Sequence, residues 1–362
     1  MEITNLDTIL EKRLHDAPIT GAEILYLLEL TDSRQREKLF SMARILRSRY
    51  FEDKVFLYGF VYFSTYCRND CTFCYYRKSN SACTRYRKTN REIVDIACAL
   101  AETGVHLIDL TMGEDPYYLA NSVEGHKRLV EIVDLVKSST RLPIMISPGM
   151  VPKKTLIELK NAGANWYACY QETHNYQLYE KLRLNQSYEE RWAIKVFARQ
   201  MGMLVEEGLL VGVGDSPADI THSLLEMSRL GAQQVRTMSF VPQQGTPLYN
   251  AIAINNSKEL NIIAVMRLLF PDKLIPASLD VEGVLGLKQR LDAGANVITS
   301  LIPSEGGLVG VSQSTLDISE GNRTVQGILP ILKDCGLIPA TLAEYVGWLE
   351  KQQGQAAKEE VI

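Results

Sequence analysis

Alternation between strand-like and helix-like segments is the feature that most constrains the fold of this 362-residue chain. Eight short runs rich in aromatic, β-branched and aliphatic residues alternate with segments that carry apolar residues at helical spacing. Regular alternation of this kind predicts an α/β fold with a parallel sheet, and eight units over about 250 residues predict a closed (β/α)8 barrel of the TIM type. The strand-like runs are residues 55–64, 105–111, 143–147, 165–170, 203–212, 234–240, 274–278 and 296–302.

Both ends of the chain outside this alternation are predicted to be helical. We expect an N-terminal helical extension over residues 1–50, the barrel over 51–310, and a C-terminal helical tail over 311–362 that packs on the barrel. A doubly wound open sheet is the alternative, although it usually has fewer strands. Active sites of such barrels lie at the C-terminal ends of the strands and on the loops that follow. The search for functional residues therefore concentrates on those loops.

Composition excludes several functional classes. The net charge of −4 leaves no basic footprint for nucleic acid. No apolar run is long enough for a transmembrane helix, and the polar N-terminus lacks the apolar core of a secretory signal. We therefore expect a cytoplasmic protein with neither nucleic acid nor membrane as a partner. Seven cysteines, an odd number, argue against a disulfide framework in such a protein and leave free thiols, metal ligands or a catalytic thiol.

The loop after the first predicted strand contains Cys67, Cys71 and Cys74, a C-x3-C-x2-C pattern. Three thiolates on one loop can bind three irons of a [4Fe–4S] cluster and leave the fourth iron open. An open iron can chelate the amino and carboxylate groups of S-adenosylmethionine (SAM). A zinc site would normally need a fourth Cys or His at similar spacing, and His106 is far along the chain. The alternative is three unrelated thiols.

The segments VYFSTYCRNDCTFCYYR, DLTMGEDPYY, VRTMSFVPQQGTPL and LIPASLDVEG carry a family resemblance. They resemble the radical SAM group that contains biotin synthase, the hydrogenase maturase HydE and the 3-methylornithine synthases of pyrrolysine biosynthesis, and the last of these in particular. The resemblance covers about residues 20–345. It implies one [4Fe–4S] cluster on the three cysteines, SAM as a second cofactor, and an electron donor such as a flavodoxin or ferredoxin.

The same resemblance implies the reaction. L-Lysine would be isomerised to (3R)-3-methyl-D-ornithine after a 5′-deoxyadenosyl radical abstracts a hydrogen, by fragmentation and recombination of the carbon chain. No side chain is expected to be catalytic beyond this radical. The protein would hold the fragments in a closed, dry barrel so that they recombine at the right carbon.

The resemblance also implies the SAM contacts. On the residues alone, the Gly-Glu-Asp sequence after the second strand is a common turn, and Arg191 in the first turn of a helix could equally be a solvated surface residue. The 211–215 segment VGVGD is not a phosphate loop, because no Lys-Ser/Thr follows it. The SAM-binding residues implied are Phe73, Tyr75, Gly113, Glu114, Ser147, Glu172, Arg183 and Arg191.

Charged residues near the ends of the predicted strands suggest the substrate contacts, because charges in barrel strands are costly unless they are paired. We expect Arg236, Ser278 and Asp280 to hold the α-amino acid end of lysine, and Asp109 to hold its distal ammonium. The alternative is a buried structural salt bridge between Asp109 and Arg236.

Differences between this sequence and its relatives reduce the number of reactions to consider. Biotin synthase uses cysteines of its barrel strands for a second, sulfur-donating cluster, whereas the corresponding stretches DLTMG, MISPG and EEGLLVG have none. Sulfur insertion is therefore not expected. Two alternatives remain open, which are a HydE-like maturase acting on another small substrate and a non-catalytic iron–sulfur or zinc-binding scaffold.

Overall fold

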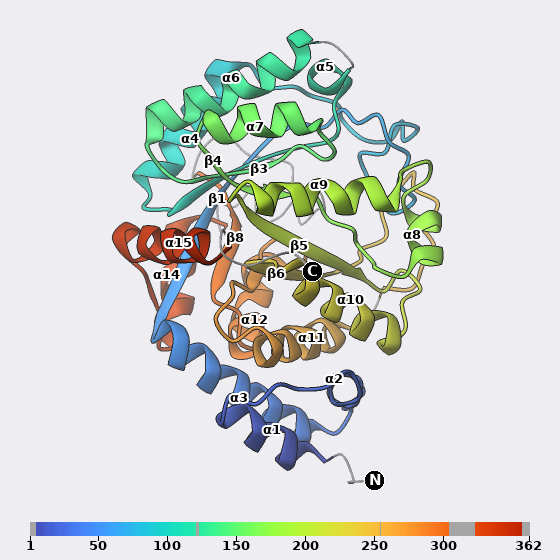
Figure 1. Cartoon of the computed structure of the whole chain (residues 1–362), viewed down its shortest axis with the longest axis vertical. Coiled ribbons are helices and arrows are strands. Elements are labelled where there is room, and N and C mark those ends of the chain that lie inside the picture. Colours follow the sequence, from blue (N-terminus) through green and yellow to red (C-terminus); the bar gives the residue numbers. More distant parts are fainter. Residues whose placement is uncertain (1–4, 121–122, 254, 304–322, 357–362) are drawn as a thin grey trace.

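A computed structural model describes residues 5–120, 123–253, 255–303 and 323–356 of the chain (Figure 1). The eight predicted strands are confirmed, and all neighbouring pairs are parallel. They are β1 (Lys54–Ser64), β2 (Leu107–Met112), β3 (Ile144–Ser147), β4 (Ala164–Ala168), β5 (Leu204–Val211), β6 (Gln234–Ser239), β7 (Pro276–Ser278) and β8 (Val297–Leu301).

The sheet curls into a nearly closed barrel with the order β6-β5-β4-β3-β2-β1-β8-β7. The barrel closes where Gln234 of β6 forms a parallel bridge with Leu274, two residues before β7. The strands are buried almost throughout, as expected for a parallel sheet covered by helices. The barrel prediction is therefore confirmed. The short strand β9 (Ile338–Pro339), which pairs with Lys54 and Val55 at the start of β1, was not predicted.

Helices cover the outside of the barrel between successive strands (Figure 1). Several begin at capping boxes, for example at Thr89 with Glu92 and at Ser216 with Asp219. The covering helices are α4 (Asn90–Glu102), α6 (Val123–Thr140), α7 (Lys153–Asn161), α9 (Tyr188–Gln200), α10 (Pro217–Leu230), α11 (Asn256–Leu269) and α12 (Leu287–Asp292). Short helices in the loops after the strands are α5 (Pro116–Leu119), α8 (Tyr176–Leu182) and η1 (Gly283–Gly286).

The N-terminal segment forms α1 (Leu6–Leu14), α2 (Gly21–Leu28) and α3 (Ser33–Phe51), with α3 packed on α11 and α2 on α10 (Figure 1). After the barrel come α14 (Val325–Asp334) and α15 (Leu342–Ala356). The expected boundary between barrel and tail, at 310/311, lies outside the described residues. Among the helices described, none is long and apolar enough to cross a membrane.

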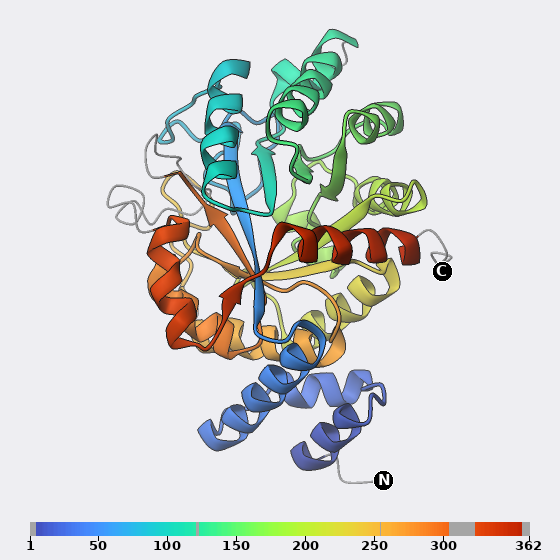
Figure 2. The same ribbon diagram turned by 90° about the vertical axis from the view of Figure 1, so that its left-hand side faces the viewer.

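Helix α15 lies across the end of the barrel where the strands begin (Figure 2). Its Tyr345 is fully buried there, and its hydroxyl contacts the Tyr58 hydroxyl at 2.9 Å and accepts a hydrogen bond from Trp166 Nε1 at 3.1 Å. Trp348 of the same helix stacks on Trp166 with an interplanar angle of 9°. This end of the barrel is thus filled by aromatic side chains, and the opposite end is left for a site.

Candidate active site

A cavity of about 250 Å³ lies at the C-terminal ends of the strands. It brings together residues from seven strands or the loops that follow them, as a barrel of this kind predicts. All of the expected site residues line this cavity except Ser278, which lies behind Asp280. The lining residues that were expected are Cys67, Cys71, Phe73, Cys74, Tyr75, Asp109, Gly113, Glu114, Ser147, Glu172, Arg183, Arg191, Arg236 and Asp280.

The cysteine loop presents its sulfurs to hydrogen-bond donors. Gln186 Nε2 lies 3.1 Å and Arg183 Nη1 3.7 Å from Cys71 Sγ, and the Asn69 N–H lies 3.5 Å from Cys67 Sγ. Donors aimed at cysteine sulfurs stabilise the negative charge of an iron–sulfur cluster and tune its potential. The donor set of this loop therefore fits a [4Fe–4S] cluster.

The number of ligands on the cysteine loop bears on the choice between a cluster and a single ion. Within the described part of the chain, no three His, Cys, Asp or Glu side chains converge as a mononuclear metal site requires. In a cubane each thiolate binds a different iron, so the three sulfurs need not converge on one point. The three thiolates thus meet the ligand count of a cubane with one open iron, whereas a structural zinc centre normally takes four Cys or His ligands.

Gly113 allows the turn after β2 to lie directly against the cysteine loop. A Cβ atom at this position would lie 2.4 Å from the Tyr66 carbonyl oxygen and 3.1 Å from Cys67 Cβ. No side chain larger than hydrogen fits there without moving one of the two loops. The glycine therefore sets the distance between the three cysteines and Glu114.

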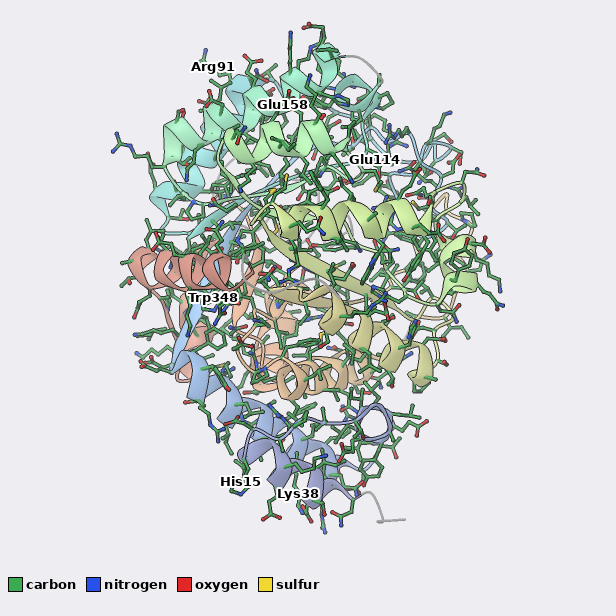
Figure 3. All side chains as sticks on the ribbon, in the orientation of Figure 1. His15, Lys38, Arg91, Glu114, Glu158 and Trp348 are labelled. Carbon is green, nitrogen blue, oxygen red and sulfur yellow. The ribbon has the colours of Figure 1, made fainter. Side chains whose placement is uncertain are left out.

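Glu114 is buried between two guanidinium groups (its position is labelled in Figure 3). Its carboxylate accepts hydrogen bonds from Arg191 Nη2 at 2.9 Å, Arg68 Nε at 3.0 Å and the Met150 N–H at 3.1 Å. Burial by itself raises the pKa of Glu114, but these partners outweigh it and hold the pKa below its ordinary value. Arg191 is only 2% exposed, so the alternative of a solvated surface arginine is wrong.

Glu172 follows β4 in a left-handed backbone conformation, with φ at 68°. One carboxylate oxygen accepts a hydrogen bond from Arg183 Nη2 at 2.7 Å, whereas the other is buried without a partner among the described residues. Burial raises the pKa of this carboxyl despite Arg183. An unpaired acceptor in a strained turn at the cavity wall is typical of a ligand contact. SAM offers ribose hydroxyls and an ammonium as donors, so the pocket fits it.

Asp109 lies deeper in the cavity, on β2. It accepts hydrogen bonds from Thr111 Oγ1 at 2.8 Å and Ser147 Oγ at 3.3 Å. Burial, followed by the negative charge of Glu206, raises the pKa of Asp109 to about 7. A cationic ligand beside this carboxyl would relieve both effects.

Arg236 on β6 does not use Asp109 as its partner. Its Nε donates to Glu206 Oε1 at 2.7 Å, and its Nη2 is buried with no partner among the residues described. Glu206 also accepts hydrogen bonds from Tyr170 Oη at 2.6 Å and Gln234 Nε2 at 2.7 Å. The expected alternative, a direct salt bridge between Asp109 and Arg236, is therefore wrong.

Glu206 and Tyr170 were both missed by sequence analysis. Glu206 does not line the cavity but lies behind Arg236 and Tyr170, which do. The signal was available, because a glutamate pair in β5 breaks the rule that barrel strands are apolar. Successive side chains of a strand point to opposite faces of the sheet, so Glu206 and Glu207 have different surroundings. Glu206 bonds Arg236 of β6, whereas Glu207 pairs with Lys195 of the surrounding helix α9.

Asp280 follows β7, and three side chains among the described residues donate hydrogen bonds to it. It accepts hydrogen bonds from Ser300 Oγ at 2.7 Å, Arg323 Nη2 at 2.8 Å and Ser278 Oγ at 3.0 Å. Burial raises its pKa, but Arg323 and the other partners outweigh this and lower the pKa below its ordinary value. Asp280 therefore presents a fixed negative charge at the cavity wall, and Ser278 acts on the cavity only through it.

Comparisons with known proteins place the chain in context. Residues 61–226 match the radical SAM superfamily. The chain is 44% identical to 3-methylornithine synthase of Methanosarcina acetivorans over 95% of this chain and 97% of that one. It is 32% identical to the [FeFe] hydrogenase maturase subunit HydE of Thermotoga maritima, over 80% and 82% of the two chains. A crystal structure of methylornithine synthase (PylB) superimposes with a TM-score of 0.89 at 43% identity and covers 94% of this chain.

Proposed function

The chain belongs to the 3-methylornithine synthase family of the radical SAM superfamily, and from this premise we propose that it converts L-lysine to (3R)-3-methyl-D-ornithine. It is thus a radical SAM enzyme of pyrrolysine biosynthesis, a lysine mutase. The HydE-like alternative is less well supported, because that relative is 32% identical and matches a smaller share of the chain.

The single observation that supports lysine most strongly is the balance of charge at the deep end of the cavity. Among the described residues, Asp109 and Asp280 line this end and Glu206 lies behind it, which gives three carboxyl groups against the guanidinium groups of Arg236 and Arg323. With all of them ionised the excess is one negative charge. Lysine carries two ammonium groups and one carboxylate, so its net charge of +1 is equal in size and opposite in sign to that excess.

The individual polar atoms match the same ligand. The unpartnered Nη2 of Arg236 is a donor for the substrate carboxylate, and Asp280 is an acceptor for the α-ammonium. Asp109 is an acceptor for the distal ammonium, whose charge would stabilise the ionised carboxylate. Each of these three groups would then have a partner in the bound substrate.

The cofactors would occupy the outer part of the cavity. Cys67, Cys71 and Cys74 would hold the [4Fe–4S] cluster, which together with SAM supplies the 5′-deoxyadenosyl radical. Glu172, with its unpaired oxygen, and Arg191 and Arg183 would orient SAM, and Phe73 and Tyr75 would contact its adenine. Gly113 keeps Glu114 and the cysteines close together. Ser147 lines the same cavity and donates a hydrogen bond to Asp109 of the proposed substrate site.

The chain's part in the reaction is to position the substrate and exclude water. Phe60, Tyr62, Leu210 and Met238 line the cavity together with the cluster loop and Arg236. Apolar walls protect a carbon radical from side reactions, and a fixed orientation favours recombination of the two fragments at one carbon.

The test is a reaction of the reconstituted enzyme, reduced with dithionite, with SAM and L-lysine under anaerobic conditions. We expect a product with the mass of lysine that separates from lysine on chiral chromatography. Iron and sulfide should be near four each per chain, with an EPR spectrum that shifts when SAM binds. Cleavage of SAM without any lysine isomer would contradict the mutase assignment and favour a maturase-like reaction, whereas zinc alone would favour the scaffold.

A further inference from the structure

The loop that carries the cysteines is strongly basic. Between β1 and α4, residues 65–89 contain six arginines and lysines and a single acid, Asp70, although the whole chain has a net charge of −4. Positive charge is therefore concentrated around the cluster site. The basic residues of this loop are Arg68, Arg77, Lys78, Arg85, Arg87 and Lys88.

Two of these arginines expose their charge while their counterions lie beneath them. The Arg68 and Arg87 side chains are 39% and 31% exposed, and their partners Glu114 and Asp115 are 8% and 0% exposed. A molecule that approaches this face therefore meets guanidinium groups and not the carboxylates below them.

Arg87 also belongs to an exposed stack of arginines and tyrosines. Its guanidinium carbon lies 4.7 Å from the ring centre of Tyr66 and 4.3 Å from that of Tyr117, and the Arg128 guanidinium lies 4.4 Å from Tyr117. Tyr66 and Tyr117 are 40% and 44% exposed. We call these four residues together with Arg68 the arginine–tyrosine patch.

The patch is held rigid from below. Asp115 accepts two hydrogen bonds from Arg87, at 2.7 and 2.8 Å, and one from Ser64 Oγ at 2.5 Å. The Tyr117 N–H also donates to Asp115, at 2.9 Å. Pre-ordered arginine and tyrosine side chains lose little conformational entropy on binding and are enriched among the residues that dominate protein interfaces.

We propose that the arginine–tyrosine patch is the docking surface for an acidic one-electron carrier protein. The inference rests on the proposed function, because reductive cleavage of SAM consumes one electron that must come from outside the chain. That electron and one electron of the cleaved C5′–S bond would form the lone pair of the methionine thioether, the other bond electron would stay on the 5′ carbon, and the carrier would be oxidised by one electron. Tyr66 is the immediate neighbour of Cys67, so the patch adjoins the cluster site. A positive surface attracts an acidic carrier and orients it before contact.

The test uses two acidic probes, a flavodoxin and a [2Fe–2S] ferredoxin. It measures the Kd of each probe for the reconstituted enzyme, and the rate at which each reduced probe bleaches the [4Fe–4S] cluster of the enzyme. The variants are Arg128→Glu, which reverses a charge of the patch, and Tyr117→Leu, which removes the stacking partner shared by two arginines. Neither residue lines the cavity. We expect Arg128→Glu to weaken binding and slow reduction about tenfold at low ionic strength, and Tyr117→Leu to do so less strongly.

The matched control is Arg34→Glu, an equal charge reversal at an exposed residue of α3. In Figure 3, Lys38 on the same helix lies at the bottom of the molecule, whereas Glu114 beside the patch lies in its upper part. This control should leave binding of both probes unchanged. Reduction by dithionite, which needs no docking surface, should have the same rate in every variant.

Three results would overturn the proposal. They are a failure of both probes to bind at low ionic strength, unchanged binding by Arg128→Glu, or equal weakening by Arg34→Glu. The assay with dithionite and lysine reports on the proposed function separately. If the parent enzyme bound neither probe but still isomerised lysine, only the docking surface would be refuted. Patch-dependent binding without any lysine isomer would refute only the mutase assignment.

Discussion

At the scale of single residues, the site depends on charges whose ionisation is set by burial. Asp109 is the clearest case, because burial and Glu206 raise its pKa to about 7. Between its ordinary pKa of 3.8 and about 7, the folded protein retains a proton that the unfolded chain has released. This carboxyl alone therefore lowers the free energy of unfolding as the pH rises through that window.

Binding of the substrate should show the opposite dependence on pH. The distal ammonium of lysine needs an ionised Asp109, so the apparent KM for lysine should fall as the pH rises towards 7 and then level off. Well below pH 7 the change should approach about tenfold per pH unit. Steady-state KM measured between pH 5.5 and 8.5 checks this. A flat profile in the parent enzyme would exclude Asp109 as the ammonium ligand.

Two variants assign this profile to its residues. Asp109→Asn should raise KM and abolish the inflection while iron content stays unchanged. Glu206→Gln removes the nearby negative charge, so the inflection should move to lower pH, and KM should rise because Arg236 loses the carboxylate that holds its Nε. An unchanged inflection in Glu206→Gln would contradict the coupling between the two acids.

At the scale of elements, the turn after β2 and the cysteine loop after β1 form one unit because Gly113 permits their contact. Gly113→Ala places a Cβ 2.4 Å from the Tyr66 carbonyl oxygen and must displace one of the two loops. We expect at least a tenfold loss of SAM affinity, measured by equilibrium dialysis, and reduced iron content.

The control for this substitution is Gly347→Ala in α15, where an added Cβ meets nothing within 4 Å. It should leave SAM binding unchanged and slightly stabilise the helix, because alanine is the better helix former. SAM binding of the parent strength in Gly113→Ala would show that the two loops adjust independently.

At the scale of the whole molecule, the two ends of the barrel have separate tasks. The cavity occupies the end where the strands finish, and α15 fills the end where they begin (Figure 2). Tyr345→Phe removes the hydroxyl that contacts both Tyr58 and Trp166 and leaves two buried polar groups without this partner. We expect a loss of roughly 1–3 kcal/mol in the free energy of unfolding.

Turnover at 25 °C should be unchanged in Tyr345→Phe, because none of the aromatic residues Tyr58, Trp166 and Tyr345 lines the cavity. Thermal unfolding and lysine isomerisation are to be compared with those of Tyr50→Phe, which changes an exposed tyrosine. A fall in turnover per loaded cluster, without loss of iron, would show that the two ends are coupled.

The sequence by itself determined the barrel and the cysteine loop, because both are local patterns. Strand and helix periodicity extends over a few residues at a time, and the three cysteines lie within eight positions, so their spacing is a property of one loop. Charged residues in predicted barrel strands also led to Asp109 and Arg236, since burial makes such exceptions informative.

Only the tertiary structure decided which charges meet. Arg191 is buried against Glu114 seventy-seven positions away, Arg236 binds Glu206 and not Asp109, and Asp280 pairs with Arg323 from beyond the barrel strands. These pairs follow from strand order, register and closure of the barrel, which bring distant residues to one end of the sheet. Periodicity along the chain contains no information about such long-range neighbours, and it is these neighbours that set the ionisation and orientation of the site.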